Sequence, residues 1–179
     1  MTLDDEKQRH TNSFAWCLSR CAAVMTQQPL HESCDDAKLA ELAGDAKEWK
    51  QRVPNCVIWR FKGTGANSRK RLAEALMNGG SALIKLERTK SAKVESDIFW
   101  VWVVGIEMQK VPETKTSSKA MAALVVSPEW LPSWASGYGA RVSWGLNGLC
   151  IVRSVEGHLL NCRYAEMVLM EPKYLQCAR

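Results

Sequence analysis

Residues 97–107 of the chain read Asp-Ile-Phe-Trp-Val-Trp-Val-Val-Gly-Ile-Glu and contain its longest apolar run. Branched and aromatic side chains of this kind favour a β-strand, and the run is shorter than the ~18 apolar residues of a membrane-spanning helix. Alternate side chains of a strand point to opposite faces. One face would carry Ile98, Trp100, Trp102, Val104 and Ile106, and the other Phe99, Val101 and Val103. Because both faces are apolar, the segment is predicted to be a central strand covered on both sides.

Upstream of this strand, the sequence has the pattern of a strand, a helix and a second strand. Strands are predicted at Cys56–Phe61 and Ala82–Leu86, and a helix from Ser68 to Asn78. Asn78 and the glycine pair after it are typical of a helix end. Together these segments predict a βαβ unit.

Downstream, the pattern is that of an antiparallel meander. Met121–Val126 is a predicted strand, and Asn147-Gly148 between two apolar segments, 142–146 and 149–152, is a strong hairpin signal. A second turn at Glu156-Gly157 leads into residues 158–164, and residues 167–170 are predicted to form a last strand or a helical turn.

The first 52 residues are predicted to be helical. Asn12 or Ser13 can cap a helix that runs to about Met25 with one apolar stripe, and residues 33–49 predict a second helix. We therefore expect an α+β fold with an N-terminal helical pair, a βαβ unit and a C-terminal β-meander around one mixed or antiparallel sheet. Residues 1–52 would form the helical region and residues 53–179 the α+β core, within one compact domain.

The main functional candidate is the glycine-containing basic stretch between the first predicted strand and its helix. Residues 61–71 read Phe-Lys-Gly-Thr-Gly-Ala-Asn-Ser-Arg-Lys-Arg. The glycine spacing matches neither a P-loop nor a dinucleotide fingerprint. A tight turn before a helix N-terminus still favours an anion. The predicted anion site comprises Lys62, Gly63, Gly65, Ser68, Arg69, Lys70 and Arg71, with a second cluster at Lys85, Arg88, Lys90 and Lys93.

The charge distribution supports the same segment. The net charge of the chain is +5, and residues 51–100 carry 10 basic and 4 acidic side chains. A local basic excess predicts a polyanionic partner, RNA or DNA, bound through its phosphate backbone. The chain is interpreted as a small cytosolic, non-enzymatic nucleic-acid-binding accessory protein or a subunit of a larger nucleoprotein assembly. The simpler alternative is a tight turn with exposed basic side chains.

A second interpretation is a protein-interaction module, an adaptor or an inhibitor. Its docking loop would be residues 127–139, which hold Trp130, Trp134 and Tyr138 among prolines. Exposed aromatic side chains are good anchors for a protein partner. The alternative for this loop is that it folds over the core.

A third interpretation is a papain-like cysteine hydrolase that uses Cys17 and His158, with Asn161 or Glu166 orienting the histidine. Cys17 also lies on the apolar stripe of the first predicted helix, where a thiol serves as a small core side chain.

No cofactor, metal or membrane partner is predicted. The potential ligands His10, Cys17, Cys21, His31 and Cys34 match no common zinc spacing. The seven cysteines, an odd number, suggest no disulfide framework, and the acidic N-terminal sequence does not resemble a signal peptide. These features favour a cytosolic location.

Overall fold

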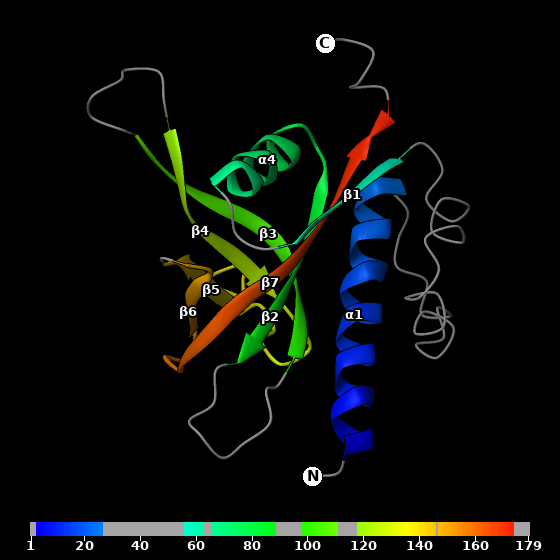
Figure 1. The fold of residues 1–179 in the computed structure, drawn as a ribbon, viewed down its shortest axis with the longest axis vertical. Helices are drawn as coiled ribbons and strands as arrows, with labels where there is room; N and C mark the ends of the chain where they lie inside the picture. The colour runs from blue at the N-terminus through cyan, green and yellow to red at the C-terminus, as the bar shows by residue number, and fades with distance from the viewer. Residues whose placement is uncertain are drawn as a thin grey trace.

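The protein is a closed antiparallel barrel of six strands, seen in a computed structural model that describes residues 3–26, 56–62, 66–88, 98–110, 118–145 and 147–173. The strands follow one another around the barrel in chain order, and the last strand closes the ring by pairing with the first (Figure 1). They are β2 (Ser81–Arg88), β3 (Ile98–Lys110), β4 (Ser118–Val126), β5 (Ala140–Trp144), β6 (Leu149–Ser154) and β7 (Leu159–Pro172).

A seventh strand, β1 (Cys56–Lys62), lies outside this ring and pairs with the second half of β7. The first half of β7 pairs with β6 along the same edge, and the opposite edge pairs with β2 over most of its length. β7 therefore joins all three neighbours, and its length of 14 residues makes that possible.

The helix α4 (Ala66–Met77) connects β1 to β2 and lies at one end of the barrel (Figure 1). Strands β1 and β2 are both antiparallel to β7, so they run parallel to each other, but β7 lies between them. The predicted order of strand, helix and strand is therefore confirmed, whereas the predicted βαβ unit with adjacent strands is wrong. The predicted α+β class is wrong too, because strands dominate the chain and the sheet closes on itself.

The main core fills the barrel and continues onto α4. It contains Leu72 and Ala75 of α4 and inward side chains of all six barrel strands, for example Ile84, Val101, Val125, Val142, Val152 and Leu169. Because alternate residues of each strand point inward, the barrel interior is an apolar core to which α4 adds its buried face.

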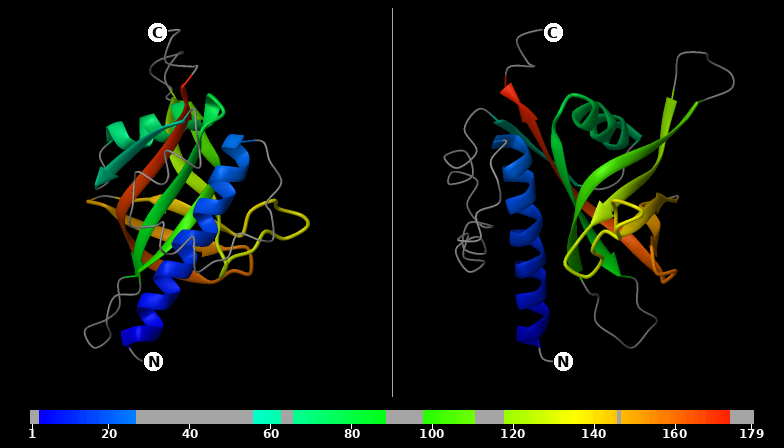
Figure 2. Two further views of the ribbon diagram at one scale, coloured as in Figure 1. Left: turned by 90° about the vertical axis from the view of Figure 1, so that its right-hand side faces the viewer. Right: turned by 180° about the vertical axis from the view of Figure 1, so that it is seen from behind.

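A second core lies between the outer surface of the barrel and the long helix α1 (Leu3–Thr26). The stripe predicted from the sequence is confirmed at Phe14, Cys17, Leu18 and Cys21, which are buried. They pack on Leu83, Trp100, Val168 and Met170, outward residues of β2, β3 and β7. Figure 2 shows α1 lying along one side of the barrel. The helix begins ten residues before the predicted Ser13, and the predicted helix at residues 33–49 lies outside the described part of the chain.

Strand β3 confirms the prediction of a strand covered on both sides. Phe99, Val101 and Val103 face the barrel core, while Trp100 and Trp102 lie beneath α1. A bulge at Val104 shifts the pairing with β4, so Ile106 packs against the barrel core and not on the face of the tryptophans. One extra residue in a strand reverses which side chains point inward.

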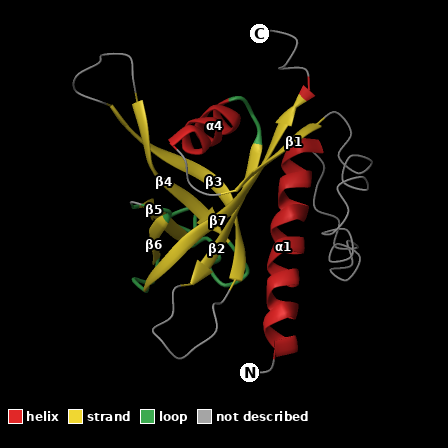
Figure 3. Ribbon diagram, viewed as in Figure 1, coloured by secondary structure: helices red, strands yellow, loops and turns green. Residues whose placement is uncertain are grey.

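The predicted Asn147-Gly148 hairpin is confirmed. Both residues have positive φ values, 53° and 79°, as the preferred two-residue hairpin turn requires. The two segments predicted at residues 158–164 and 167–170 form a single strand, β7, with a register shift at Ala165. Figure 3 shows the resulting predominance of strands over helices. None of the described helices has the length and apolar character of a membrane-spanning segment.

Candidate functional site

The three consecutive cations of α4 do not form one anion site, because successive helix positions point in different directions. Lys70 points to solvent and lies 3.9 Å from Glu74. Arg71 is held by Glu74 at 3.3 Å and by Glu171 at 2.9 Å. The buried Glu171 carboxylate also accepts a hydrogen bond from Trp59 Nε1 at 3.0 Å, so Arg71 serves to pair a buried acid.

The other predicted residues around the helix start are also dispersed. Ser68 is buried. Arg69 acts electrostatically on Tyr164, an inward residue whose burial raises its pKa, so Arg69 lies on the barrel side of α4. Arg88 is exposed at the end of β2, beside the buried Cys162. Gly63, Gly65, Lys90 and Lys93 lie outside the described residues.

Two of the predicted cations do meet, on the outer surface of the barrel. Lys62 of β1 and Lys85 of β2 are both register partners of Glu166 on β7, so the three side chains form one row across three strands. Arg60, two residues before Lys62, binds Glu166 Oε1 through Nε at 2.7 Å and through Nη2 at 2.6 Å. Because Arg60 already pairs with the one carboxylate of this row, the charges of Lys62 and Lys85 remain uncompensated there.

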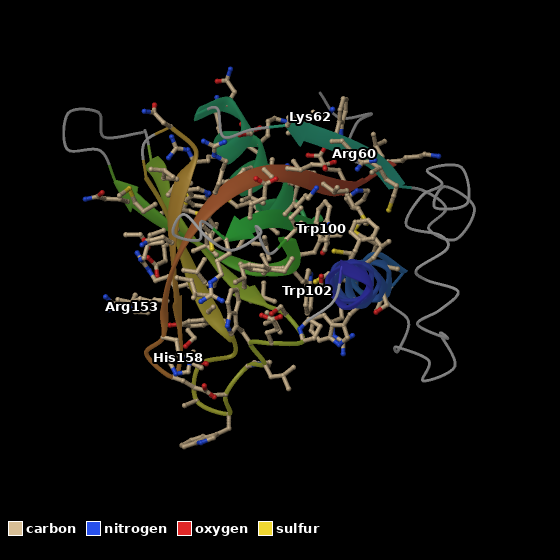
Figure 4. All side chains as sticks on the ribbon, turned by 60° about the horizontal axis from the view of Figure 1, so that its bottom comes forward. Arg60, Lys62, Trp100, Trp102, Arg153 and His158 are labelled. Atoms are coloured by element: carbon tan, nitrogen blue, oxygen red, sulfur yellow. The ribbon has the colours of Figure 1, made fainter. Side chains whose placement is uncertain are left out.

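Two further arginines continue this surface along β7. Arg163 of β7 and Arg153 of β6 are exposed and alternate with buried inward residues such as Cys162 and Val152. Figure 4 shows Arg60 and Lys62 beside one end of β7 and Arg153 and His158 beside the other. We define the β7 face as the outward residues Lys62, Lys85, Leu149, Ile151, Arg153, Leu159 and Arg163.

The four cations of the β7 face have no ion pair with any described residue. Two carboxylates lie opposite these cations in the strand register: Glu166, which Arg60 holds, and Glu87, which lies opposite Arg163 on β2. Glu156 lies in the turn after β6, and its one ion pair with a described residue is with His158, at 4.0 Å. At the usual rise per residue of a strand, the four cations extend along about 23 Å of β7.

The same face exposes aliphatic side chains. Leu149, Ile151 and Leu159 are 50%, 51% and 58% exposed. Leu149 is the register partner of Arg163, and Leu159 is that of Arg153. On the part of the outer surface that α1 covers, outward side chains such as Leu83 and Val168 are buried. The β7 face is therefore a mixed surface in which arginine and aliphatic side chains lie side by side.

Arg153 and Arg163 were missed by the sequence reasoning, although a signal existed. Once the hairpin is placed, Leu149, Ile151 and Arg153 fall on one side of β6, and Leu159, Asn161 and Arg163 fall on the same side of β7. What the sequence did not show is that this side faces outward and that β1 brings Lys62 to it.

The two tryptophans of the aromatic loop, residues 127–139, have different surroundings. Trp130 packs edge-to-face on Phe99, with ring centroids 5.2 Å apart, whereas Trp134 is 100% exposed. Tyr138 is half-buried. Backbone hydrogen bonds in both directions between Ser127 and Trp130, each 3.1 Å, hold the loop at its base.

The loop conformation also depends on Gly139. Its amide donates to Val125 O at 2.9 Å, and an added Cβ would lie 1.8 Å from Trp130 O. The hydroxyl groups of Ser133 and Ser136 form a hydrogen bond of 2.7 Å in the segment that carries Trp134. Trp134 is thus exposed on a loop that internal hydrogen bonds hold in place.

The structure does not bring Cys17 and His158 together. Cys17 is buried beneath α1, its thiol donates to Trp100 O at 3.4 Å, and burial raises its pKa well above the usual value. His158 lies in the exposed turn before β7, on the far side of the barrel from α1 (Figure 4). A thiol nucleophile is activated by an adjacent base or by a lowered pKa. The pKa of Cys17 is raised, and no residue of the described ranges supplies a base beside it.

Within the described ranges, no three histidine, cysteine or acidic side chains lie close enough together to hold a metal ion. No protein-family model and no curated protein matches the chain. The fold and the chemistry of the β7 face are therefore the features that point to a function.

Proposed function

We propose that the protein binds the phosphate backbone of a nucleic acid through the β7 face, as a non-enzymatic accessory protein or a subunit of a larger nucleoprotein assembly. The observation that carries the proposal is the alignment of Lys62, Lys85, Arg153 and Arg163, four cations that form no ion pair with any described residue, on one outer face of the barrel. Cations that neutralise phosphates release bound counterions, which makes binding favourable and salt-dependent.

The proposal moves the predicted site away from the start of α4. Lys62 and Lys85 remain in it, while Arg71 is assigned to the pair with Glu171. Lys85, Arg153 and Arg163 stand on barrel strands that are hydrogen-bonded on both edges, which makes them a more rigid support for cations than a loop would be.

The test is a salt titration of binding to mixed-sequence RNA and DNA with three double variants of equal charge change. Arg153→Gln with Arg163→Gln alters one end of the β7 face, and Lys62→Gln with Lys85→Gln alters the other. Lys70→Gln with Lys173→Gln is the control, since Lys70 and Lys173 are exposed but lie off the face.

Each variant of the face should lower the slope of log affinity against log salt by about 1.4, the value for two lost contacts to a single strand. The control should keep the slope of the unaltered protein. Absence of binding at about 50 mM salt, or equal weakening by the control variant, would contradict the proposal.

A second candidate function is supported by Trp134, whose indole is fully exposed on an ordered loop. Residues 127–139 contain one charged side chain, the acidic Glu129, so this loop does not suit a phosphate backbone. A protein partner with an apolar pocket would suit it, because exposed tryptophans are frequent anchors of interfaces.

The test is Trp134→Ala, compared with Met77→Ala on α4, where the side chain is 70% exposed. Trp130 is unsuitable because it packs on Phe99. We expect the proteins recovered with the tagged chain from cells to be lost with Trp134→Ala and retained with Met77→Ala. Unchanged recovery with both variants would remove this candidate. The same tagged chain tests the predicted cytosolic location.

A further inference from the structure

We infer that the β7 face takes a single-stranded nucleic acid in preference to a duplex, an inference that rests on the proposed function. The β7 face does not consist of cations alone. Leu149 lies opposite Arg163, and Leu159 lies opposite Arg153, in adjacent strands. Ile151 lies between these two rows on β6. Each arginine therefore has an aliphatic neighbour on the same surface.

This alternation matches the two kinds of surface that a single strand presents. Its phosphates carry the negative charge, and its unpaired bases have apolar faces that are open to contact. The three aliphatic side chains are at least half exposed, so covering them with bases removes apolar surface from water. The guanidinium groups of Arg153 and Arg163 can meanwhile contact the neighbouring phosphates.

A duplex matches the same surface poorly. Its bases are stacked inside, and its outer surface is charged backbone, which would lie against Leu149, Ile151 and Leu159. A two-stranded ribbon can enter the major groove, which is about 12 Å wide. Strands β6 and β7 cannot act as such a ribbon, because β5 pairs with the other edge of β6 and β2 with the other edge of β7.

The length of the face is also sufficient for several nucleotides. The four cations extend over about 23 Å of strand, and one OB-fold domain covers about 4 to 16 nucleotides of a single strand. Lys62 and Lys85 lie beyond the aliphatic rows, at the end of β7 where Glu166 is already held by Arg60. They would contact the backbone of the same strand after its bases leave the aliphatic surface.

The experiment compares three labelled probes by fluorescence anisotropy with the full chain at about 50 mM salt. The probes are a DNA strand of about 16 nucleotides without self-complementarity, the RNA strand of the same sequence, and the DNA duplex. We expect at least one single strand to bind about tenfold more tightly than the duplex.

Variants of the aliphatic residues separate base contact from charge. Ile151→Thr and Leu159→Thr keep side chains that suit a strand and should each weaken single-strand binding about fivefold. The salt dependence should stay unchanged, since no cation is lost, and so should the weaker duplex binding. Leu131→Thr is the matched control, because Leu131 is 61% exposed and lies in the loop after β4, off the β7 face.

The outcomes distinguish this inference from the proposed function. Equal or tighter binding of the duplex, or full affinity of both threonine variants, overturns the inference and leaves backbone binding in place. Failure of all three probes to bind overturns both. Both are also overturned if an acidic protein or peptide binds the β7 face and no nucleic acid displaces it.

Discussion

Among the described residues, Glu107 and Arg141 form the ion pair with the most hydrogen bonds. Arg141 on β5 reaches over β4 to Glu107 on β3, with Nε at 2.8 and 2.9 Å from the two carboxylate oxygens and Nη2 at 2.6 Å from Oε2. Arg141 also donates to Ser143. These hydrogen bonds lower the pKa of Glu107 below its usual value. A lowered pKa in the folded state means that the charged carboxylate stabilises the fold.

We predict that Glu107→Gln destabilises the protein at neutral pH and has little effect in acid. The pair is partly exposed, so the expected loss is about 0.5–1 kcal/mol at pH 7. The contribution is present above the pKa of Glu107 in the unfolded chain and is lost as the pH falls through its lowered folded pKa. Urea denaturation of both proteins at about pH 7 and about pH 3 checks this. A difference that is the same at both pH values would contradict it.

The buried cysteines show that the role of a thiol, catalytic or structural, depends on the residues around it. Burial raises the pKa of Cys21 to about 12, and Ser81 donates its hydroxyl hydrogen bond to the Cys21 sulfur at 3.0 Å. Ser81 in turn accepts from Trp102 Nε1 at 3.0 Å. Cys17 and Cys21 therefore belong to the contact between α1 and the barrel, which the apolar stripe of the sequence had already indicated.

At the scale of elements, α1 is attached to the barrel by one stripe of side chains and a few polar contacts. Phe14 packs edge-to-face on Trp100 at 4.6 Å between centroids, and Ser13 Oγ accepts from the backbone amide of Trp100 at 3.2 Å. Beside this contact, the guanidinium of Arg20 stacks over Trp16, which is partly buried against the same core, at 3.5 Å from the ring centroid.

We predict that the stripe, and not the helix as a whole, stabilises the fold. Leu18 is 1% exposed and Val24 is 45% exposed on the same helix. Leu18→Ala should cost about 2–5 kcal/mol through the cavity it leaves, whereas Val24→Ala should change stability by less than about 0.5 kcal/mol. Denaturant midpoints of the two variants give the comparison. Similar losses for both would show that α1 packs differently.

At the scale of the whole molecule, β7 holds the barrel together. It pairs with β6 and β1 along one edge and with β2 along the other, while β1 pairs with β7 alone among the described strands.

We therefore predict a clear order of amide hydrogen exchange. The amides of Met167, Val168 and Leu169, between β1 and β2, should exchange at rates close to those of global unfolding. The amides of β1 that bond to β7 should exchange much sooner, since β1 can detach without opening the ring. Equal protection of β1 and β7 would argue against the peripheral position of β1.

Local patterns predicted most elements but not their arrangement. Propensity and period located the strands at Cys56, Ala82 and Ile98, the end of α4 and the Asn147-Gly148 hairpin, because these depend on neighbouring residues. The βαβ prediction failed because the sequence does not say that a strand from the far end of the chain, β7, lies between β1 and β2. The bulge at Val104 likewise depends on the pairing with β4.

In the candidate site, too, the sequence predicted some of the residues and only the fold decides which of them act together. Composition identified the basic segment, and two of its members, Lys62 and Lys85, lie on the β7 face. Arg71 was indistinguishable from them in sequence, and only the fold places Glu171 beside it. Among the loop aromatics, Trp130 and Trp134 have similar neighbours in sequence, yet one packs on Phe99 and the other is fully exposed.

By itself, the sequence determined which segments form strands and helices, which face of α1 is apolar and where the positive charge is concentrated, because these properties depend on residues close together in the chain. Only the tertiary structure decided that the sheet closes into a barrel, that α1 covers part of its outer surface, and that Lys62, Lys85, Arg153 and Arg163 share another part of that surface. Those outcomes depend on the register between β7 and three partners distant in sequence, and no local pattern of residues encodes that register.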